Sequence, residues 1–382
     1  MLKTLHNFIK LESSSAFILL FFTFLALFLS NSPWSIYYDK LVNEHISIHF
    51  LNLQFNTQLL HITNEGLMTI FFLLVGLEIK YELFYGALNS FSKALLPGVA
   101  AVGGMIVPAA IYVVINYSNH VSLKGWAIPT ATDIAFTLGI LTLLGSRIPT
   151  ALKIFLLALA IFDDLAAIIV IAVFYTTNIS FLYLEFAFIC LVILIILNRV
   201  NVKQLIFYWV FGAGLWFCLM KSGIHPTLAG GVLAFLIPMR NRDDNPSDRL
   251  KHSLHPWVAF GILPLFAFAN AGVSFVTISL SDLEMSVVLG AFCGLFFGKQ
   301  IGVFGFSWLA LKCGWAQLPE NVLWRDLYAI SILCGVGFTI SLFIGTLAFG
   351  DYSAHLDSVK IGVLLGSLLS GIIGYVLLLR KR

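Results

Sequence analysis

The sequence predicts an all-α integral membrane protein, in which residues 1–382 form a single domain with about twelve transmembrane helices. Hydrophobic residues make up 59% of the chain and charged residues only 11%, whereas soluble domains carry about 25% charged residues. The mean hydropathy is +0.95. Apolar runs long enough to cross about 30 Å of hydrocarbon recur along the chain. Lipid is therefore the expected surroundings of most of this protein.

The apolar runs predict the individual transmembrane segments. They lie near residues 12–31, 58–85, 94–116, 123–144, 151–175, 181–198, 204–220, 223–238, 254–277, 285–310, 327–349 and 358–379. The seventh and eighth runs are short for a complete crossing. An even number of crossings places both termini on one side of the membrane.

The distribution of basic residues predicts which side that is. If the N-terminus is cytoplasmic, most Lys and Arg residues fall in cytoplasmic connections, as the positive-inside rule requires. The connections on the other side contain only Lys40, Lys124, Lys221 and Lys360. We therefore expect both termini in the cytoplasm. The net charge of +3 is small, and its distribution along the chain is more informative than the total. We expect no nucleic-acid partner.

The longest outside connection, residues 32–57, alternates apolar and polar residues over 45–50 and 51–55. This alternation predicts two short strands, with Asn52 near the turn of a β-hairpin. Because a lone hairpin is marginal in water, pairing with a second copy of the chain through residues 45–58 would stabilise it. A hairpin that packs on its own chain explains the pattern equally well.

Two apolar runs share small and helix-breaking residues near their middles. Residues 125–145 and 330–350 also contain an aligned Phe-Thr pair, Phe136-Thr137 and Phe338-Thr339. Gly and Pro interruptions at matching places in two halves indicate discontinuous helices at a transporter binding site. Ordinary Gly-rich packing helices are the alternative interpretation.

Four ionisable residues lie deep within the predicted spans: Asp133, Asp163, Asp164 and Lys299. Each costs roughly 2.5–3.5 kcal/mol at a helix centre on insertion scales. Together they are too costly to be retained without a partner or a function. A buried ion pair that fixes helix packing is the structural alternative, but a single pair leaves two carboxylates unexplained.

The adjacent pair Asp163-Asp164 suggests ion exchange. Neighbouring residues on a helix point about 100° apart, so both carboxylates reach one cavity only if it is broad. Repulsion and desolvation favour the protonated form of at least one of them, and a hard cation such as sodium or lithium relieves the same repulsion. Protons and cations then compete for one site, with Asp163 and Asp164 as the metal ligands. Lys299 is expected to pair with one of the two and to lose its proton when a cation displaces it; a purely structural salt bridge is the alternative.

Other polar residues suggest supporting roles. Thr132 or Asp133 is expected to cap a half-helix, and Lys299 to oppose the C-terminal ends of half-helices. Near the cytoplasmic face, histidine and glutamate residues suggest a response to pH, because imidazole titrates between pH 5 and 8. These candidates are Glu78, Glu82, His252, His255 and, at a helix start, His225. Solvated loop residues are the alternative.

Several function classes remain beside an ion exchanger. A carrier of organic solutes predicts a larger pocket, and a channel would conduct without obligatory proton coupling. A membrane-embedded enzyme with paired aspartates is disfavoured, because the sequence around Asp163-Asp164 has neither a GxGD nor a DDxxD motif and no HExxH occurs. We therefore expect a transporter and no enzyme activity or cofactor.

The stretches PTATDIAFTLGIL, LALAIFDDLAAI, HPTLAG and HPWVAFGILPLFAFANAGV, with Lys299, make the chain resemble the NhaA family of bacterial sodium/proton antiporters over essentially its whole length. The resemblance implies twelve helices in the inner membrane, an inverted repeat that relates spans three to five with spans ten to twelve, and unwound middles in spans four and eleven. It also implies a homodimer joined through the outside hairpin.

The resemblance implies electrogenic exchange of sodium or lithium for protons, with roles in sodium and pH homeostasis. Asp163 and Asp164 would bind the cation with Thr132 nearby, and Asp133 and Lys299 would balance helix ends. Two positions in the pH-response region depart from the family pattern, because Tyr81 stands where an arginine is expected and Lys251 where an acid is expected. These departures leave the pH of activation open.

Overall fold

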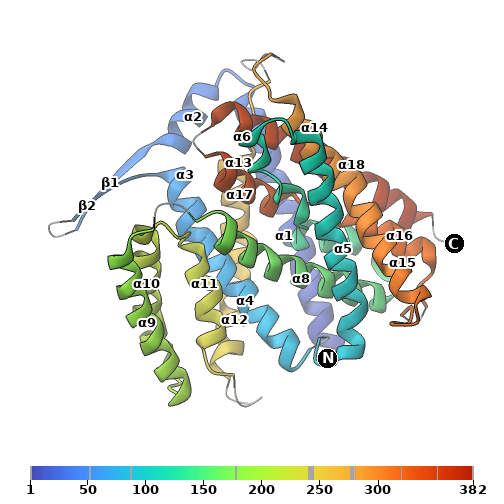
Figure 1. Ribbon diagram of the computed structural model, residues 1–382, viewed down its shortest axis with the longest axis horizontal. Helices are drawn as coiled ribbons and strands as arrows, with labels where there is room; N and C mark the ends of the chain where they lie inside the picture. Colours follow the sequence, from blue (N-terminus) through green and yellow to red (C-terminus); the bar gives the residue numbers. More distant parts are fainter. Residues whose placement is uncertain are drawn as a thin grey trace.

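The computed structural model describes residues 2–50, 53–86, 88–176, 179–239, 245–275, 279, 281–319, 321–350 and 352–380, and shows a bundle of helices with one strand pair (Figure 1). Each predicted span coincides with a helical segment. Seven helices are long and apolar enough to cross a membrane alone, or up to ten if each of three bent pairs counts as one span. The remaining two predicted spans are the short helix α11 (Thr227–Leu236) and the helical segment over residues 59–84.

The first span bends sharply before the strand pair. Helix α1 (Leu2–Ser30) meets α2 (Ser35–Asn43) at 117°. Pro33 lies in the connection and cannot continue a helix. The bend turns the chain out of α1 and leads it into the strands.

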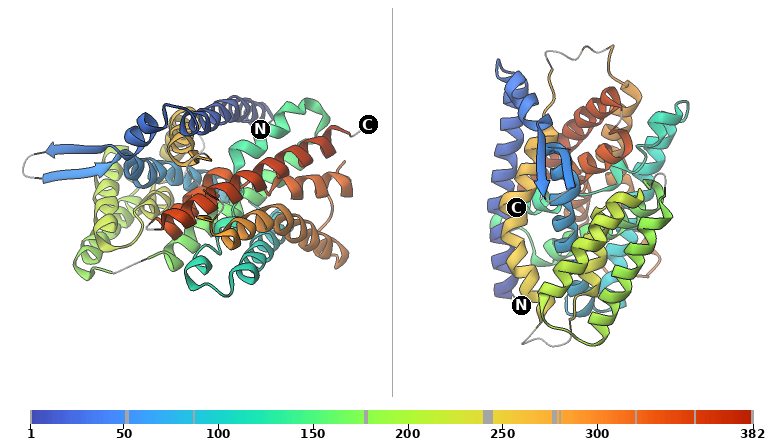
Figure 2. Two further views of the ribbon diagram at one scale, coloured as in Figure 1. Left: turned by 90° about the horizontal axis from the view of Figure 1, so that it is seen from above. Right: turned by 90° about the vertical axis from the view of Figure 1, so that its left-hand side faces the viewer.

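Strand β1 (His45–Phe50) pairs antiparallel with β2 (Leu53–Gln58), so that His45 lies opposite Gln58. The pair lies where the sequence predicts a hairpin, although β2 runs further than predicted and Asn52 lies outside the described residues. The strands project away from the helices (Figures 1 and 2). Their free edges are therefore available for pairing with another strand.

The remaining helices of the N-terminal part include the fourth span, which is broken. They are α3 (Leu59–His61), a π-helical segment (Ile62–Leu67), α4 (Met68–Phe84), α5 (Phe91–Asn116), α6 (His120–Leu123), a 3-10 turn (Ile128–Thr130), α7 (Ile134–Leu143), a 3-10 turn (Gly145–Arg147) and α8 (Thr150–Phe174). The two halves of the fourth span, 120–130 and 134–143, meet at 41°.

The C-terminal part also contains a broken span. Its helices are α9 (Phe181–Arg199), α10 (Leu205–Ser222), α11, α12 (Pro246–Trp257), a π-helical segment (Val258–Ile262), α13 (Leu263–Ala271), α14 (Met285–Cys293), π-helical segments (Gly294–Gly298 and Gln300–Phe304), α15 (Gly305–Lys312), α16 (Trp324–Leu333), α17 (Phe338–Phe349) and α18 (Ser353–Leu379). Helices α16 and α17 also meet at 41°. Both spans predicted to be broken, near residues 125–145 and 330–350, are therefore interrupted in the structure.

Glycines bring α5 against the tenth span, which carries Lys299. A Cβ atom added at Gly302 would lie 2.2 Å from the carbonyl oxygen of Gly103, and one added at Gly103 would lie 2.3 Å from the oxygen of Gly302. Because glycine has no side chain, the two backbones touch directly. This contact places Lys299 beside the break in the fourth span.

Candidate ion-binding site

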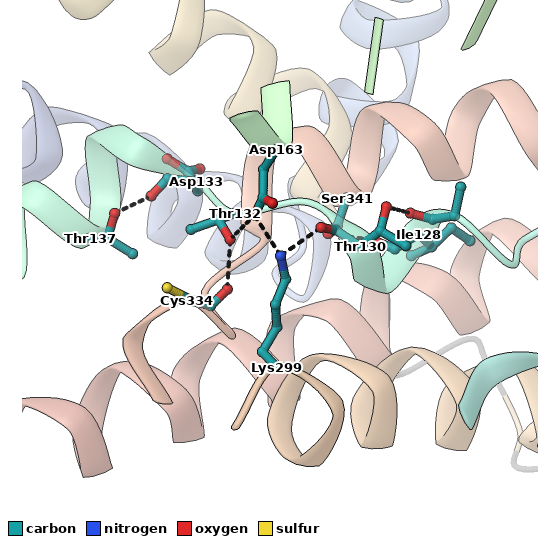
Figure 3. A network of polar contacts seen from close by, with 10 residues as sticks. Ile128, Thr130, Thr132, Asp133, Thr137, Asp163, Lys299, Cys334 and Ser341 are labelled. Atoms are coloured by element: carbon teal, nitrogen blue, oxygen red, sulfur yellow. Dashed lines mark hydrogen bonds and ion pairs between the residues drawn. The ribbon is translucent and has the colours of Figure 1, made fainter. Parts of the chain in front are cut away.

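Asp163 and Asp164 lie near the middle of α8, and both are almost completely buried, at 2% and 1% exposure. Their surroundings differ. Asp163 Oδ2 accepts hydrogen bonds from Lys299 Nζ at 2.6 Å and from Thr132 Oγ1 at 2.7 Å (Figure 3). Of the two neighbouring carboxylates, the one that pairs with the lysine is therefore Asp163.

Lys299 also contacts the end of a half-helix. Its Nζ donates to the carbonyl oxygen of Thr130 at 2.6 Å, and Thr130 is the last residue of the 3-10 turn that ends the first half of the fourth span. Helix C-termini carry a partial negative charge. The lysine therefore lies where its positive charge offsets both a carboxylate and a helix end.

Asp133 occupies the opposite electrostatic position, at the N-terminal ends of two half-helices. Its Oδ1 accepts from the backbone N–H of Phe136 at 3.1 Å, so it caps α7. Its Oδ2 accepts from the backbone N–H and the hydroxyl of Thr339 in α17, at 3.0 and 2.6 Å. A single carboxylate thus offsets the partial positive charge of both helices.

Further hydrogen bonds tie the two breaks together. The Asp133 N–H donates to the carbonyl of Val336 at 2.7 Å, and Ser341 Oγ donates to that of Ile128 at 2.7 Å. The Thr132 hydroxyl, which has one proton, lies 3.0 Å from the carbonyl of Cys334 as well as near Asp163. Cation binding at Asp163 would let this hydroxyl turn to the carbonyl.

Asp164 faces a small cavity between α4, α8, α12 and the two breaks. The cavity measures about 40 Å³, and its polar lining includes Thr132, Asp133, Glu78, His255 and Thr339. Since a buried water needs roughly 10–15 Å³, this space suits a few waters or a small cation. It is small beside the pockets of about 300–1,000 Å³ that hold organic ligands, which argues against an organic solute.

Two carboxylate oxygens in this region accept no hydrogen bond from the described residues. They are Oδ1 of Asp163 and Oδ1 of Asp164, and both are buried. Buried oxygens of this kind are rare unless they meet water, a proton or an ion. The described ranges contain no group of three or more His, Cys, Asp or Glu side chains arranged for a metal, so a cation at this pair would draw further oxygen ligands from hydroxyls, carbonyls or water.

The proposed pH-response residues differ in their relation to the cavity. Glu78 and His255 line the cavity, whereas Glu82 lies one turn beyond Glu78 and outside the lining. The His252 side chain is 62% exposed and lies 3.7 Å from Asp248. His225 precedes α11 and is not part of the lining either.

The two departures from the family pattern contact each other. Lys251 Nζ lies 3.5 Å from the ring centroid of Tyr81 and 3.0 Å from Asp248 Oδ1. A cation–π contact therefore joins α4 to α12 where the pattern leads us to expect an arginine and an acid.

Sequence analysis assigned no role to Thr339 or Ser341. Thr339 follows Phe338 as Thr137 follows Phe136, and the two rings pack edge to face at 5.3 Å between centroids. The aligned Phe-Thr pairs were the available signal, because matching positions in two halves meet where the halves cross.

Comparison with known proteins gives one consistent result. A family model described as Na+/H+ antiporter 1 matches residues 6–378. The chain is 51% identical over 381 residues to Na(+)/H(+) antiporter NhaA 1 of Syntrophotalea carbinolica, covering 99% of this chain and 96% of that protein. It is 49% identical over 375 residues to Na(+)/H(+) antiporter NhaA of Shewanella loihica (98% and 96%) and 51% identical over 394 residues to that of Rhodospirillum rubrum (100% and 98%).

Proposed function

The chain belongs to the NhaA family of Na+/H+ antiporters, and from this premise we propose that Asp163 and Asp164 are the groups at which sodium and protons compete. The protein is a multi-span transporter of the bacterial inner membrane and no enzyme. Sodium ions and protons are its substrates, and it needs no cofactor.

The observation that supports this site most directly is the unequal environment of the two carboxylates. Asp163 is held by Lys299 and Thr132, whereas Asp164 lines the cavity and its Oδ1 accepts no hydrogen bond from the described residues. Of the two adjacent carboxylates, Asp164 is thus the one that an ion in the cavity meets first. A sodium or lithium ion that binds both carboxylates would displace Lys299 from Asp163, because two positive charges on one buried carboxylate repel each other.

The displacement of Lys299 determines how many protons are released for each cation that binds. In the proton-loaded state Asp164 carries a proton and Lys299 is an ammonium paired with Asp163. When one cation binds, Asp164 releases its proton, and Lys299, which has lost its carboxylate partner, releases a second. Two protons then exchange for one cation, so each cycle moves one net charge and the membrane potential drives transport.

Regulation by pH and the orientation are parts of the same proposal. Glu78 and His255 line the cavity that leads to Asp164, and a histidine titrates in the physiological range, so these two are the candidates for a pH response. The Lys and Arg distribution supports an orientation with both termini in the cytoplasm. The projecting strands β1 and β2 offer edges for a homodimer through residues 45–58.

The test is sodium-induced proton movement in everted vesicles across a pH series. We expect sodium and lithium to dissipate the proton gradient in the wild type and to have no effect in Asp164→Asn, because the amide cannot release a proton. Asp282→Asn, at an exposed acid outside the spans, is the matched control and should behave like the wild type. Exchange by an Asp164→Asn protein that inserts normally would refute the proposed site.

A further inference from the structure

Helix α11 ends inside the protein. It has ten residues, so it spans about 15 Å, half of the hydrocarbon thickness. The last carbonyl groups of a helix have no partners within it, and Ile237, the residue that follows α11, is buried. The end of α11 therefore needs hydrogen-bond donors from neighbouring spans.

Lys80 of α4 supplies most of them. Its side chain is buried, and Nζ lies 2.5 Å from the carbonyl oxygen of Ile237, 2.8 Å from that of Phe235 and 3.4 Å from that of Ala234. Asn198 of α9 completes the set, because its Nδ2 donates to the carbonyl oxygen of Leu236 at 2.6 Å. The end of α11 is thus capped by two side chains from two different helices.

The same contact fixes the rotation of α4. Lys80 and Glu78 are two residues apart, so they point about 200° apart around the helix. While Lys80 holds the end of α11, Glu78 lines the cavity together with Asp164. A rotation of α4 about its axis would remove both side chains from these positions at once.

Glycines fix the distance between the two helices. A Cβ atom added at Gly230 of α11 would lie 2.1 Å from the carbonyl oxygen of Thr69 in α4, and one added at Gly76 would lie 2.6 Å from Cβ of Ala234. The backbones of α4 and α11 are therefore in direct contact. Gly76 and Lys80 are four residues apart on one face of α4, so the glycine contact and the Lys80 cap together hold the opposite face of α4 toward the cavity.

We propose that Lys80 is a positioning residue of the transport site, which acts by locking α4 to the end of α11 so that Glu78 stays directed at the cation cavity. The inference rests on the proposed function, because it takes this cavity as the route of the cation. It gives Lys80 a role in sodium binding without any contact to the ion.

The test compares two variants that uncap the same helix end. Lys80→Met removes the cap that comes from α4, whereas Asn198→Ala removes the cap that comes from α9 and leaves α4 in place. We expect both to lower the unfolding temperature. Only Lys80→Met should raise the sodium concentration for half-maximal exchange, by about threefold or more, and Lys80→Arg should restore it. Equal half-maximal concentrations in Lys80→Met and Asn198→Ala would overturn the proposal.

A double variant tests whether Lys80 acts through Glu78. If it does, Lys80→Met should have little further effect on the half-maximal sodium concentration in a Glu78→Gln background, and simple additivity would overturn the inference. Should Lys80→Met fail to accumulate, Lys80→Gln replaces it, since its shorter amide cannot reach all three carbonyls. Failure of the proposed site is seen separately, as exchange by Asp164→Asn; an inactive Asp164→Asn with an unaffected Lys80→Met refutes the role of Lys80 alone.

Discussion

Lys299 at the crossing of the broken helices and Lys80 at the end of α11 are the two buried lysines within the described residues. Both donate to backbone carbonyls at the end of a helical segment. Lys299 also contacts a carboxylate, Asp163, at 2.6 Å, whereas the hydrogen bonds of Lys80 all go to carbonyl oxygens. At both sites a lysine offsets the partial negative charge of a helix end. Only Lys299 has a carboxylate partner as well.

The carboxylate of Asp163 allows ion exchange beside Lys299, whereas Lys80, which contacts only carbonyl oxygens, has a supporting role. A carbonyl oxygen cannot take up or release a proton, so protonation of its partners cannot change the contacts of Lys80. A carboxylate binds either a lysine, a proton or a cation, so the contact of Lys299 can be replaced. Close glycine contacts between α4 and α11 agree with a fixed pair, while both helices at the crossing are broken beside the carboxylates.

The largest effect is expected when Asp163 is replaced, because Lys299 then contacts no carboxylate, as is the case for Lys80 at the end of α11. Asp163→Asn should abolish sodium-driven proton movement and lower the free energy of unfolding by about 3–5 kcal/mol, because Lys299 is left as a buried charge without its partner. Vesicle assays and thermal unfolding in detergent measure the two effects. The double variant Asp163→Asn/Lys299→Gln should recover much of the stability but no exchange. A stable single variant would show that the pair is not a major stabilising contact.

An intermediate effect is expected at the opposite helix ends. Asp133→Ala removes the caps of α7 and α17 together and should cost about 2 kcal/mol of unfolding free energy, since one cap is worth about 1 kcal/mol. Thr339→Val removes only the hydroxyl contact to Asp133 and should cost less than half as much. Thermal unfolding of both variants measures this ratio. Equal losses would mean that Asp133 serves α17 alone.

The smallest effect is expected from exchanging lysine for arginine at both sites. Arginine keeps its proton in proteins, so in Lys299→Arg only Asp164 can release a proton. Exchange should then become independent of the membrane potential and slow about tenfold, which corresponds to about 1.4 kcal/mol in the barrier. Space is also limited there, because the Lys299 side chain is fully buried. Lys80→Arg, which needs only donors and charge, should exchange at nearly the wild-type rate. Similar rates in the two variants would contradict the distinction between the sites.

Much of the fold could be predicted because the membrane imposes simple rules on the sequence. Long apolar runs gave each span, and Pro and Gly residues near the middle of two runs gave the breaks. Of the two runs predicted to be short, 223–238 forms the ten-residue helix α11, whereas 204–220 forms α10, which is long enough to cross a membrane alone. The capping of its end was missed, since Lys80 appears in the sequence as one more basic residue near a cytoplasmic connection.

The candidate site was predictable in membership but not in arrangement. Asp133, Asp163, Asp164 and Lys299 stood out because a charge in an apolar span is costly. The structure brings Asp163, Lys299 and Thr132 together, and brings Glu78 and His255 to the cavity, but leaves His225 and His252 outside its lining. The position of these ionisable residues within apolar runs indicated that they lie at membrane depth. Which side chains they contact depends on how each helix is rotated, which the sequence does not show.

The sequence by itself determined the number of spans, the position of the two breaks and which ionisable groups lie at membrane depth, because each of these follows from local hydropathy and local backbone preference. Only the tertiary structure decided that Asp163 and not Asp164 pairs with Lys299, that Asp133 caps two helices, and that Lys80 holds the end of α11. The partners in these contacts lie 136, 206 and 157 residues apart along the chain. Neighbouring residues such as Asp163 and Asp164 differ by about 100° around a helix, so the packing of distant helices alone selects which of them meets the lysine and which meets the ion.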